Sequence, residues 1–283
     1  MNPFSVSDIV RLALAEDLGP GDVTTRLTVP SYRLGKARIT ARESMVLSGL
    51  KPAAETLRQV DAEAVFNSAV KDGERLAPGE EIALLEGKAA ALLSAERVML
   101  NFIMRLSGVA SLTAEYVKAA GNPKVTVVDT RKTTPGLRVL EKAAVLHGGG
   151  GNHRFALYDG ILIKDNHIAA AGSITEAVKG ARSRAAHTLK IEVEVDNLDQ
   201  LREALAAGAD IVMLDNMGLS MLAQAVAITG DHHRPGPRAT LLEASGGVNL
   251  STIGAIAQSG VDLISVGALT HSAPSVDVGL DWL

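Results

Sequence analysis

Basic side chains gather in one part of this chain. The segment from Asp129 to His167 holds four consecutive glycines, three histidines and six lysine or arginine residues: Arg131, Lys132, Arg138, Lys142, Arg154 and Lys164. Over the whole chain Asp and Glu outnumber Lys and Arg, and the formal net charge is −4. A cationic cluster in an acidic chain creates a local field. It predicts a small, highly anionic ligand rather than a nucleic-acid backbone.

The basic residues offer two kinds of chemistry. Arg131 and Arg154 present planar forks that match a carboxylate or a phosphate, whereas Lys132 and Lys164 present compact charges. Lys164 follows an apolar run, so it is either an anion contact or the Schiff-base nucleophile of a barrel lyase. The neighbouring cations could lower a lysine pKa, as a nucleophile requires. The abundance of arginine favours the anion contact.

The glycines at 148–151 would let backbone N–H groups approach a ligand closely, although a plain linker has the same composition. His153 follows them and can hydrogen-bond a carboxylate or a ring nitrogen, or serve the structure alone.

Carboxylates and small residues follow later apolar runs. Glu194 and Asp215 could act as general acid and base, or as Mg²⁺ ligands beside a polyphosphate. Glu192 shares a strand face with Glu194, and the spacing does not decide which of them reaches the ligand. Two glycine-containing strings come after the last two runs, where barrels often bind phosphate through backbone amides. They are Ser245-Gly246-Gly247 and Val266-Gly267-Ala268.

The elements that must position these residues alternate between strand and helix. Near-continuous apolar runs predict parallel strands at 124–129, 161–164, 189–195, 210–215, 239–244 and 262–267. Helical patterns at 197–209 and 249–260 stand between some of them. Polar groups at the carboxyl ends of parallel strands converge on one edge. The sequence therefore predicts an incomplete α/β barrel, with an open doubly wound sheet as the alternative.

The first hundred residues have a mixed pattern that indicates an α+β domain. Strands are predicted at 36–43, 45–50, 63–70 and 81–87, followed by a long helix over 90–120 that is broken or bent near Gly108. The absence of cysteine excludes disulfides and a thiol nucleophile. The segment before Gly19 lacks the pattern of a secretory signal, and no apolar run approaches the ~20 residues of a membrane span. We expect a soluble, cytoplasmic protein.

Several long blocks of this sequence closely resemble the quinolinate phosphoribosyltransferase family. They are EDLGPGDVTT, AERVMLNFIMRLSG, DTRKTTPGLR, GGGGNHRFALYDGILIKDNHI, IEVEV, DIVMLDNM, LEASGGV and VGALTHSAPSVDVGLD. The resemblance implies an N-terminal α/β sandwich domain at 1–108, with which the tail at 270–283 could pack. It implies an incomplete α/β barrel as the catalytic domain at 109–269. It also implies a homodimer, or a larger homo-oligomer, with a shared active site.

The resemblance assigns roles to residues one by one. Quinolinate would be bound by Arg97 of a neighbouring subunit together with Thr130, Arg131, Lys132, His153, Arg154 and Lys164. Catalytic roles would fall to Lys132, Lys164, Glu194 and Asp215. Glu194 and Asp215 would also contact the ribose and Mg²⁺, the implied cofactor. The 5-phosphate of phosphoribosyl pyrophosphate would be bound by Ser245, Gly246, Gly247, Val266, Gly267 and Ala268.

The implied reaction joins quinolinate to phosphoribosyl pyrophosphate with loss of CO₂. It gives nicotinate mononucleotide and pyrophosphate, a step of NAD biosynthesis. The chain departs from the family pattern at Ala143 and at Leu146-His147, where a tyrosine and a basic residue are expected. A divergent relative associated with molybdenum uptake has the same fold and is an alternative, but the LIKDNH block at 162–167 is intact here.

Overall fold

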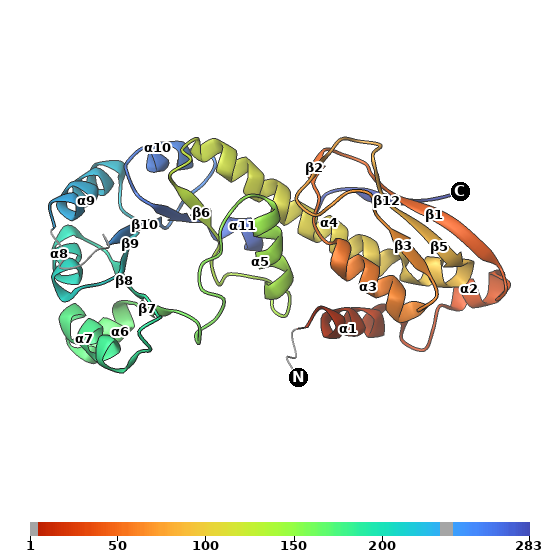
Figure 1. Ribbon diagram of the computed structural model, residues 1–283, viewed down its shortest axis with the longest axis horizontal. Helices are drawn as coiled ribbons and strands as arrows, with labels where there is room; N and C mark the ends of the chain where they lie inside the picture. Colours follow the sequence, from red (N-terminus) through yellow and green to blue (C-terminus); the bar gives the residue numbers. More distant parts are fainter. Residues whose placement is uncertain (1–4, 233–239) are drawn as a thin grey trace. The chain divides into compact units, whose positions relative to one another are not determined.

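The computed structural model describes residues 5–232 and 240–283 (Figure 1). Contacts within the chain divide it into two compact units. The first unit contains the residues up to Ala114 together with 132–149 and 269–283, and the second contains 115–131 and 150–268. The sequence placed the boundary at 108, whereas this division falls at 114 and returns 132–149 to the first unit.

The first unit is built around an antiparallel sheet. Its elements before the long helix are α1 (Val6–Leu18), α2 (Val23–Thr28), β1 (Leu34–Ala41), β2 (Met45–Val46), α3 (Leu50–Val60), β3 (Val65–Asn67), β4 (Arg75–Leu76) and β5 (Glu81–Lys88). Later segments add α5 (Arg138–His147), α11 (Ala268–His271) and β12 (Val278–Trp282). The sheet has the order β12-β1-β5-β3, and β2 pairs separately with β4. The tail of the chain thus forms an edge strand antiparallel to β1.

One continuous helix, α4 (Ala89–Ala120), connects the two units, and the predicted break near Gly108 is absent. A Cβ at Gly108 would lie 1.9 Å from the carbonyl oxygen of Pro274. The glycine is required because another backbone segment approaches the helix closely, not because the helix ends there. A glycine inside a helical pattern can mark the end of a helix or the close approach of another segment, and the sequence does not distinguish the two.

The second unit is a parallel α/β unit, as the sequence predicted. Its six strands are β6 (Thr126–Val128), β7 (Ile161–Ile163), β8 (Ile191–Val195), β9 (Ile211–Asp215), β10 (Leu241–Ser245) and β11 (Leu263–Ser265), each within or overlapping a predicted run. They pair in the order β6-β11-β10-β9-β8-β7. Figure 1 shows this sheet curved, with helices on its outer side. The helices are α6 (Asp165–Ala171), α7 (Ile174–Arg184), α8 (Leu198–Ala207), α9 (Leu219–Asp231) and α10 (Ile253–Ala257).

Local sequence explains why these helices begin and end where they do. The Asn197 side chain accepts the backbone N–H groups of Asp199 and Gln200 at the start of α8, and Gly208 ends that helix with φ 84°. Ser173 caps α7 in the same way by accepting the N–H of Glu176. In the described part of the chain, no helix combines the length and the apolar character needed to cross a membrane.

Candidate active site at the carboxyl ends of the parallel strands

The register of the sheet brings several predicted site residues to one edge. Ser245, the last residue of β10, is directly opposite Asp215, the last residue of β9. Glu194 of β8 is opposite Met213 of β9, two residues before Asp215. Parallel strands share their direction, so these side chains lie at a common edge. This is the edge where the sequence placed the chemistry.

Lys164 and Glu194 form an ion pair at this edge, between Nζ and Oε2. Lys164 follows β7 and begins α6, and its backbone N–H donates to the His167 ring at 3.0 Å. The side chain of Lys164 is 43% exposed and that of Glu194 only 15%. The pair is thus held by two neighbouring strands and remains open to a ligand from one side.

The ends of β9 and β10 are fixed to each other around Asn216. The Asn216 side-chain amide donates to Asp215 Oδ2 at 2.7 Å, and its backbone N–H donates to the Ser245 carbonyl at 2.9 Å. Asn216 has φ 52°, and no other non-glycine residue of the described part has a positive φ. Gly246 has φ 90°, and a Cβ there would lie 2.2 Å from Asn216 Oδ1. Only glycine fits between these strand ends.

Arg154 is a partly buried arginine of the second unit. Arg154 Nη1 donates to the Gly160 carbonyl at 3.0 Å, while its buried Nε has no hydrogen-bond partner among the residues described. Burial lowers the pKa of Arg154, and the positive charge of Arg131 lowers it further. Two cations near each other, one of them with a buried donor to spare, are suited to a ligand that carries more than one negative charge.

His153 precedes this arginine, and its ring lies in the interior of the second unit. Its backbone N–H donates to the fully buried Asp129, and its Nδ1 accepts the backbone N–H of Arg154 at 2.7 Å. Its Nε2 lies 3.1 Å from Glu192 Oε2 and 3.8 Å from Glu243 Oε2. The predicted contact of His153 with quinolinate stays a prediction.

Glu243 was missed by the sequence analysis. It lies on β10 and is 1% exposed. Burial raises its pKa to about 8, the negative charge of Glu192 acts in the same direction, and His153 opposes them. The signal was present in the sequence, because period-2 alternation in the strand at 241–245 turns Glu243 to the face opposite Leu242 and Ala244.

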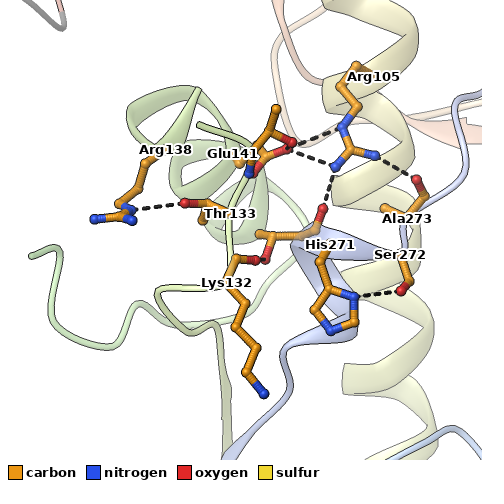
Figure 2. Close-up of polar contacts among 10 residues, drawn as sticks. Arg105, Lys132, Thr133, Arg138, Glu141, His271, Ser272 and Ala273 are labelled. Carbon is orange, nitrogen blue, oxygen red and sulfur yellow. Dashed lines mark hydrogen bonds and ion pairs between the residues drawn. The ribbon is translucent and has the colours of Figure 1, made fainter. Parts of the chain in front are cut away.

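Lys132 belongs to the first unit, where its main chain is held by a buried network (Figure 2). The Thr270 hydroxyl donates to the Lys132 carbonyl at 2.7 Å. Arg105 donates to the carbonyls of Thr270 and Ala273, and it pairs with the fully buried Glu141 at 2.8 Å. Figure 2 shows the Lys132 side chain extending away from these contacts. Neither Arg105 nor Glu141 was given a role from the sequence.

The remaining predicted site residues are divided between the two units. Arg97 is exposed on α4 of the first unit. Thr130 and Arg131 follow β6, and Val266, Gly267 and Ala268 follow β11. At the departures from the family pattern, His147 Nδ1 lies 2.8 Å from the Ser48 hydroxyl, and Leu146 is 51% exposed. The histidine has thus taken a structural contact within the first unit.

Comparison with known proteins identifies the family. The C-terminal domain of quinolinate phosphoribosyl transferase matches residues 109–281, and its N-terminal domain matches 22–107. The chain belongs to the quinolinate phosphoribosyl transferase family. It is 45% identical over 281 residues to a probable carboxylating nicotinate-nucleotide pyrophosphorylase of Bacillus subtilis, covering 99% of this chain and 94% of that protein.

Two further relatives agree with this assignment. The nicotinate-nucleotide pyrophosphorylase of Mycobacterium leprae is 43% identical, covering 97% of this chain and 96% of that protein. The solved structure of the nicotinate-nucleotide pyrophosphorylase from Francisella tularensis superposes with a TM-score of 0.90 at 40% identity, covering 98% and 96% of the two chains. The family resemblance and the fold class predicted from the sequence are confirmed.

Proposed function

We propose that this protein transfers the phosphoribosyl group of phosphoribosyl pyrophosphate to the ring nitrogen of quinolinate. The products are nicotinate mononucleotide, pyrophosphate and CO₂, and the step belongs to NAD biosynthesis. The observation that carries the proposal is the partly buried Arg154 beside Arg131, in a chain of this family. Quinolinate is a dianion, and removing it from water requires paired cations.

The reaction needs little covalent chemistry from the protein. The ring nitrogen forms a bond to C1 of the ribose as the bond from C1 to pyrophosphate breaks. The C2–carboxylate bond then breaks to release CO₂, and its electron pair is stabilised by the adjacent positive nitrogen before C2 takes up a proton. Positive charge develops at C1 during transfer, and the carboxylates of Glu194 and Asp215 at the strand edge would stabilise it.

Lys164 contributes as a cation in this proposal. Its Nζ contacts the Glu194 carboxylate, whereas a Schiff-base lysine is activated by an apolar pocket or by a cationic neighbour. The pair also orients Glu194, because Lys164 is anchored at the start of α6. A carboxylate of quinolinate would compete with Glu194 for this ammonium group as it binds.

Mg²⁺ is the proposed cofactor, and the residues at the strand edge fit it. Glu194 and Asp215 supply hard oxygen donors, and both side chains are partly exposed, as a hydrated ion requires. They would hold the ion partly through water and substrate. When bound, Mg²⁺ would neutralise negative charge on the pyrophosphate that leaves.

The oligomeric state and the location belong to the same proposal. Arg97 is an exposed cation far in sequence from the basic segment. In a homodimer, or a larger homo-oligomer, it would reach the quinolinate of a neighbouring subunit. The phosphate of the ribose would be bound by the segments 245–247 and 266–268. We place the reaction in the cytoplasm, in agreement with a chain free of cysteine.

The direct test is to incubate the protein with Mg²⁺, phosphoribosyl pyrophosphate and quinolinate. We expect nicotinate mononucleotide, pyrophosphate and CO₂ in equal amounts. Nicotinate is the control substrate, because it lacks the 2-carboxylate and should give no CO₂. Quinolinate binding without pyrophosphate release would instead indicate a non-catalytic binding protein. Irreversible trapping by borohydride in the presence of substrate would indicate a Schiff-base lyase that uses Lys164.

A further inference from the structure

Three titratable side chains meet in the interior of the second unit, beneath the strand edge. His153 comes from the glycine-rich segment, Glu192 from β8 and Glu243 from β10. Their ligand atoms all lie within 4.8 Å of one another, and the two glutamates are 5% and 1% exposed. Neither glutamate has a role in the function proposed above. Buried ionisable groups are costly, so their presence calls for a reason.

The hydrogen bonding of His153 decides what the cluster can do. Its Nδ1 accepts the backbone N–H of Arg154 at 2.7 Å, so the lone pair of Nδ1 is in use. The ring proton of a neutral imidazole must then sit on Nε2, the atom that faces Glu192 and Glu243. A histidine that ligates a metal offers a lone pair instead. The composition is that of a metal site, but this tautomer directs an N–H rather than a lone pair at the carboxylates. The 3.1 Å approach of Nε2 to Glu192 Oε2 is an electrostatic contact rather than a well-aligned hydrogen bond.

The charge of the cluster points the same way. Two carboxylate groups buried side by side cannot both ionise at low cost. The pKa of Glu243 is raised to about 8 by its burial and by the charge of Glu192, so Glu243 holds a proton near neutral pH. Protonation of Glu243 removes one negative charge from the cluster and weakens its attraction for a metal cation.

A cavity of about 390 Å³ lies against the cluster and shows why polar contacts are needed there. It is lined by His153, Glu192 and Glu243 and by the first residues of three strands, Ile161, Ile211 and Leu263. Arg154 lines the same cavity, as does Val128 at the end of β6, so the cluster and the Arg154 side chain face one space. Packing cannot fix the imidazole on the side of a cavity, so its orientation depends on polar contacts: Nδ1 with the Arg154 N–H, and Nε2 with the two glutamates.

We propose that Glu192 and Glu243 are positioning residues that hold His153 and, through it, set the main chain of Arg154. The link is short: the imidazole accepts the Arg154 N–H, and the His153 N–H is held by Asp129 at 2.9 Å. The Arg154 guanidinium then donates to Gly160 with Nε left for the anion. This inference rests on the proposed function of Arg154 as a quinolinate contact. According to this inference, two buried glutamates of the parallel sheet contribute to the affinity for quinolinate.

The test compares Glu243→Gln with Glu243→Leu in the full-length protein. Glutamine keeps a neutral hydrogen-bonding group of the same shape, whereas leucine removes the polar contact at similar volume. We expect Glu243→Leu to raise the KM for quinolinate at least tenfold and to change the KM for phosphoribosyl pyrophosphate less than twofold. Glu243→Gln should recover most of that loss. Calorimetric Kd values for quinolinate provide the same comparison without turnover.

A double-mutant cycle separates positioning from general damage. In an Arg154→Ala background, Glu243→Leu should cause no further loss of quinolinate affinity, because the residue it positions is gone. Equal losses for both substrates, or the same loss with and without Arg154, would overturn the proposal. So would a stoichiometric divalent metal that both Glu243 variants release. Failure of the wild-type protein to turn over quinolinate would count against the proposed function instead, while the binding cycle would still report on Glu243.

Discussion

Replacing Gly246 by alanine should disrupt the junction between β9 and β10. The residue has φ 90°, and an added Cβ would lie 2.2 Å from Asn216 Oδ1. A left-handed conformation costs an L-residue about 1–2 kcal/mol. The clash also forces Asn216 away from Asp215, and losing that 2.7 Å hydrogen bond costs about 0.5–1.5 kcal/mol. Together we expect Gly246→Ala to lower the free energy of unfolding by roughly 2–3 kcal/mol.

Gly247→Ala, at the adjacent residue, is a matched control. Gly247 has φ 61°, and nothing lies within 4 Å of its added Cβ, so only the conformational cost of about 1–2 kcal/mol applies. Urea denaturation measures the free energy of unfolding of both variants, and the difference between the two values is due to the clash. Because Asn216 positions Asp215, Gly246→Ala should also lower kcat. The decrease should persist at saturating substrate under conditions in which the variant stays folded. Equal stabilities for the two variants would refute the steric reasoning.

Three other predictions test the site. Arg154→Ala should weaken quinolinate binding by on the order of 3 kcal/mol, about a hundredfold in Kd by calorimetry, because it leaves a desolvated carboxylate unpaired. Arg97→Ala and Lys164→Ala subunits should each be inactive, and a refolded mixture should regain activity if Arg97 acts across subunits; no recovery despite proven exchange would place the site within one chain. Glu243→Gln should gain stability relative to wild type as pH rises. The folded pKa of Glu243, about 8, exceeds its ordinary value of 4.5, so its contribution is full below pH 4.5 and is lost through pH 8, with a slope of at most ~1.4 kcal/mol per pH unit. Thermal unfolding at pH 5 and pH 8 measures this, and a gap between the two proteins that does not change with pH would contradict the assignment.

The parallel strands were predictable because their signal is local. Each is a short apolar run that ends in a polar residue, and burial on both faces requires such a run. The register that unites Glu194, Asp215 and Ser245 follows once the strands are known to be parallel. The edge of the sheet that carries the candidate site could therefore be derived from the sequence.

The position of a side chain along its strand, in the interior or at the edge of the sheet, could not be derived in the same way. Glu192 and Glu194 share a face, but two residues of strand separate them by about 6.6 Å, enough to divide interior from edge. That Glu192 meets His153 depends on where the glycine-rich segment returns to the sheet. The pairing of Arg105 with Glu141 likewise joins residues 36 apart in sequence with no pattern between them. Such long-range polar contacts leave no local periodicity.

The pairing of β12 with β1 has a consequence for how the protein is made. Thr40 of β1 faces Gly279, so the antiparallel sheet of the first unit needs residues that leave the ribosome only after the second unit. While the second unit is being translated, β1 waits with an unpaired edge, which is a template for association with other chains. The first unit to emerge is thus the last to be complete. Nascent chains stalled before residue 278 should expose this edge, and chaperone binding to them should end when β12 is released.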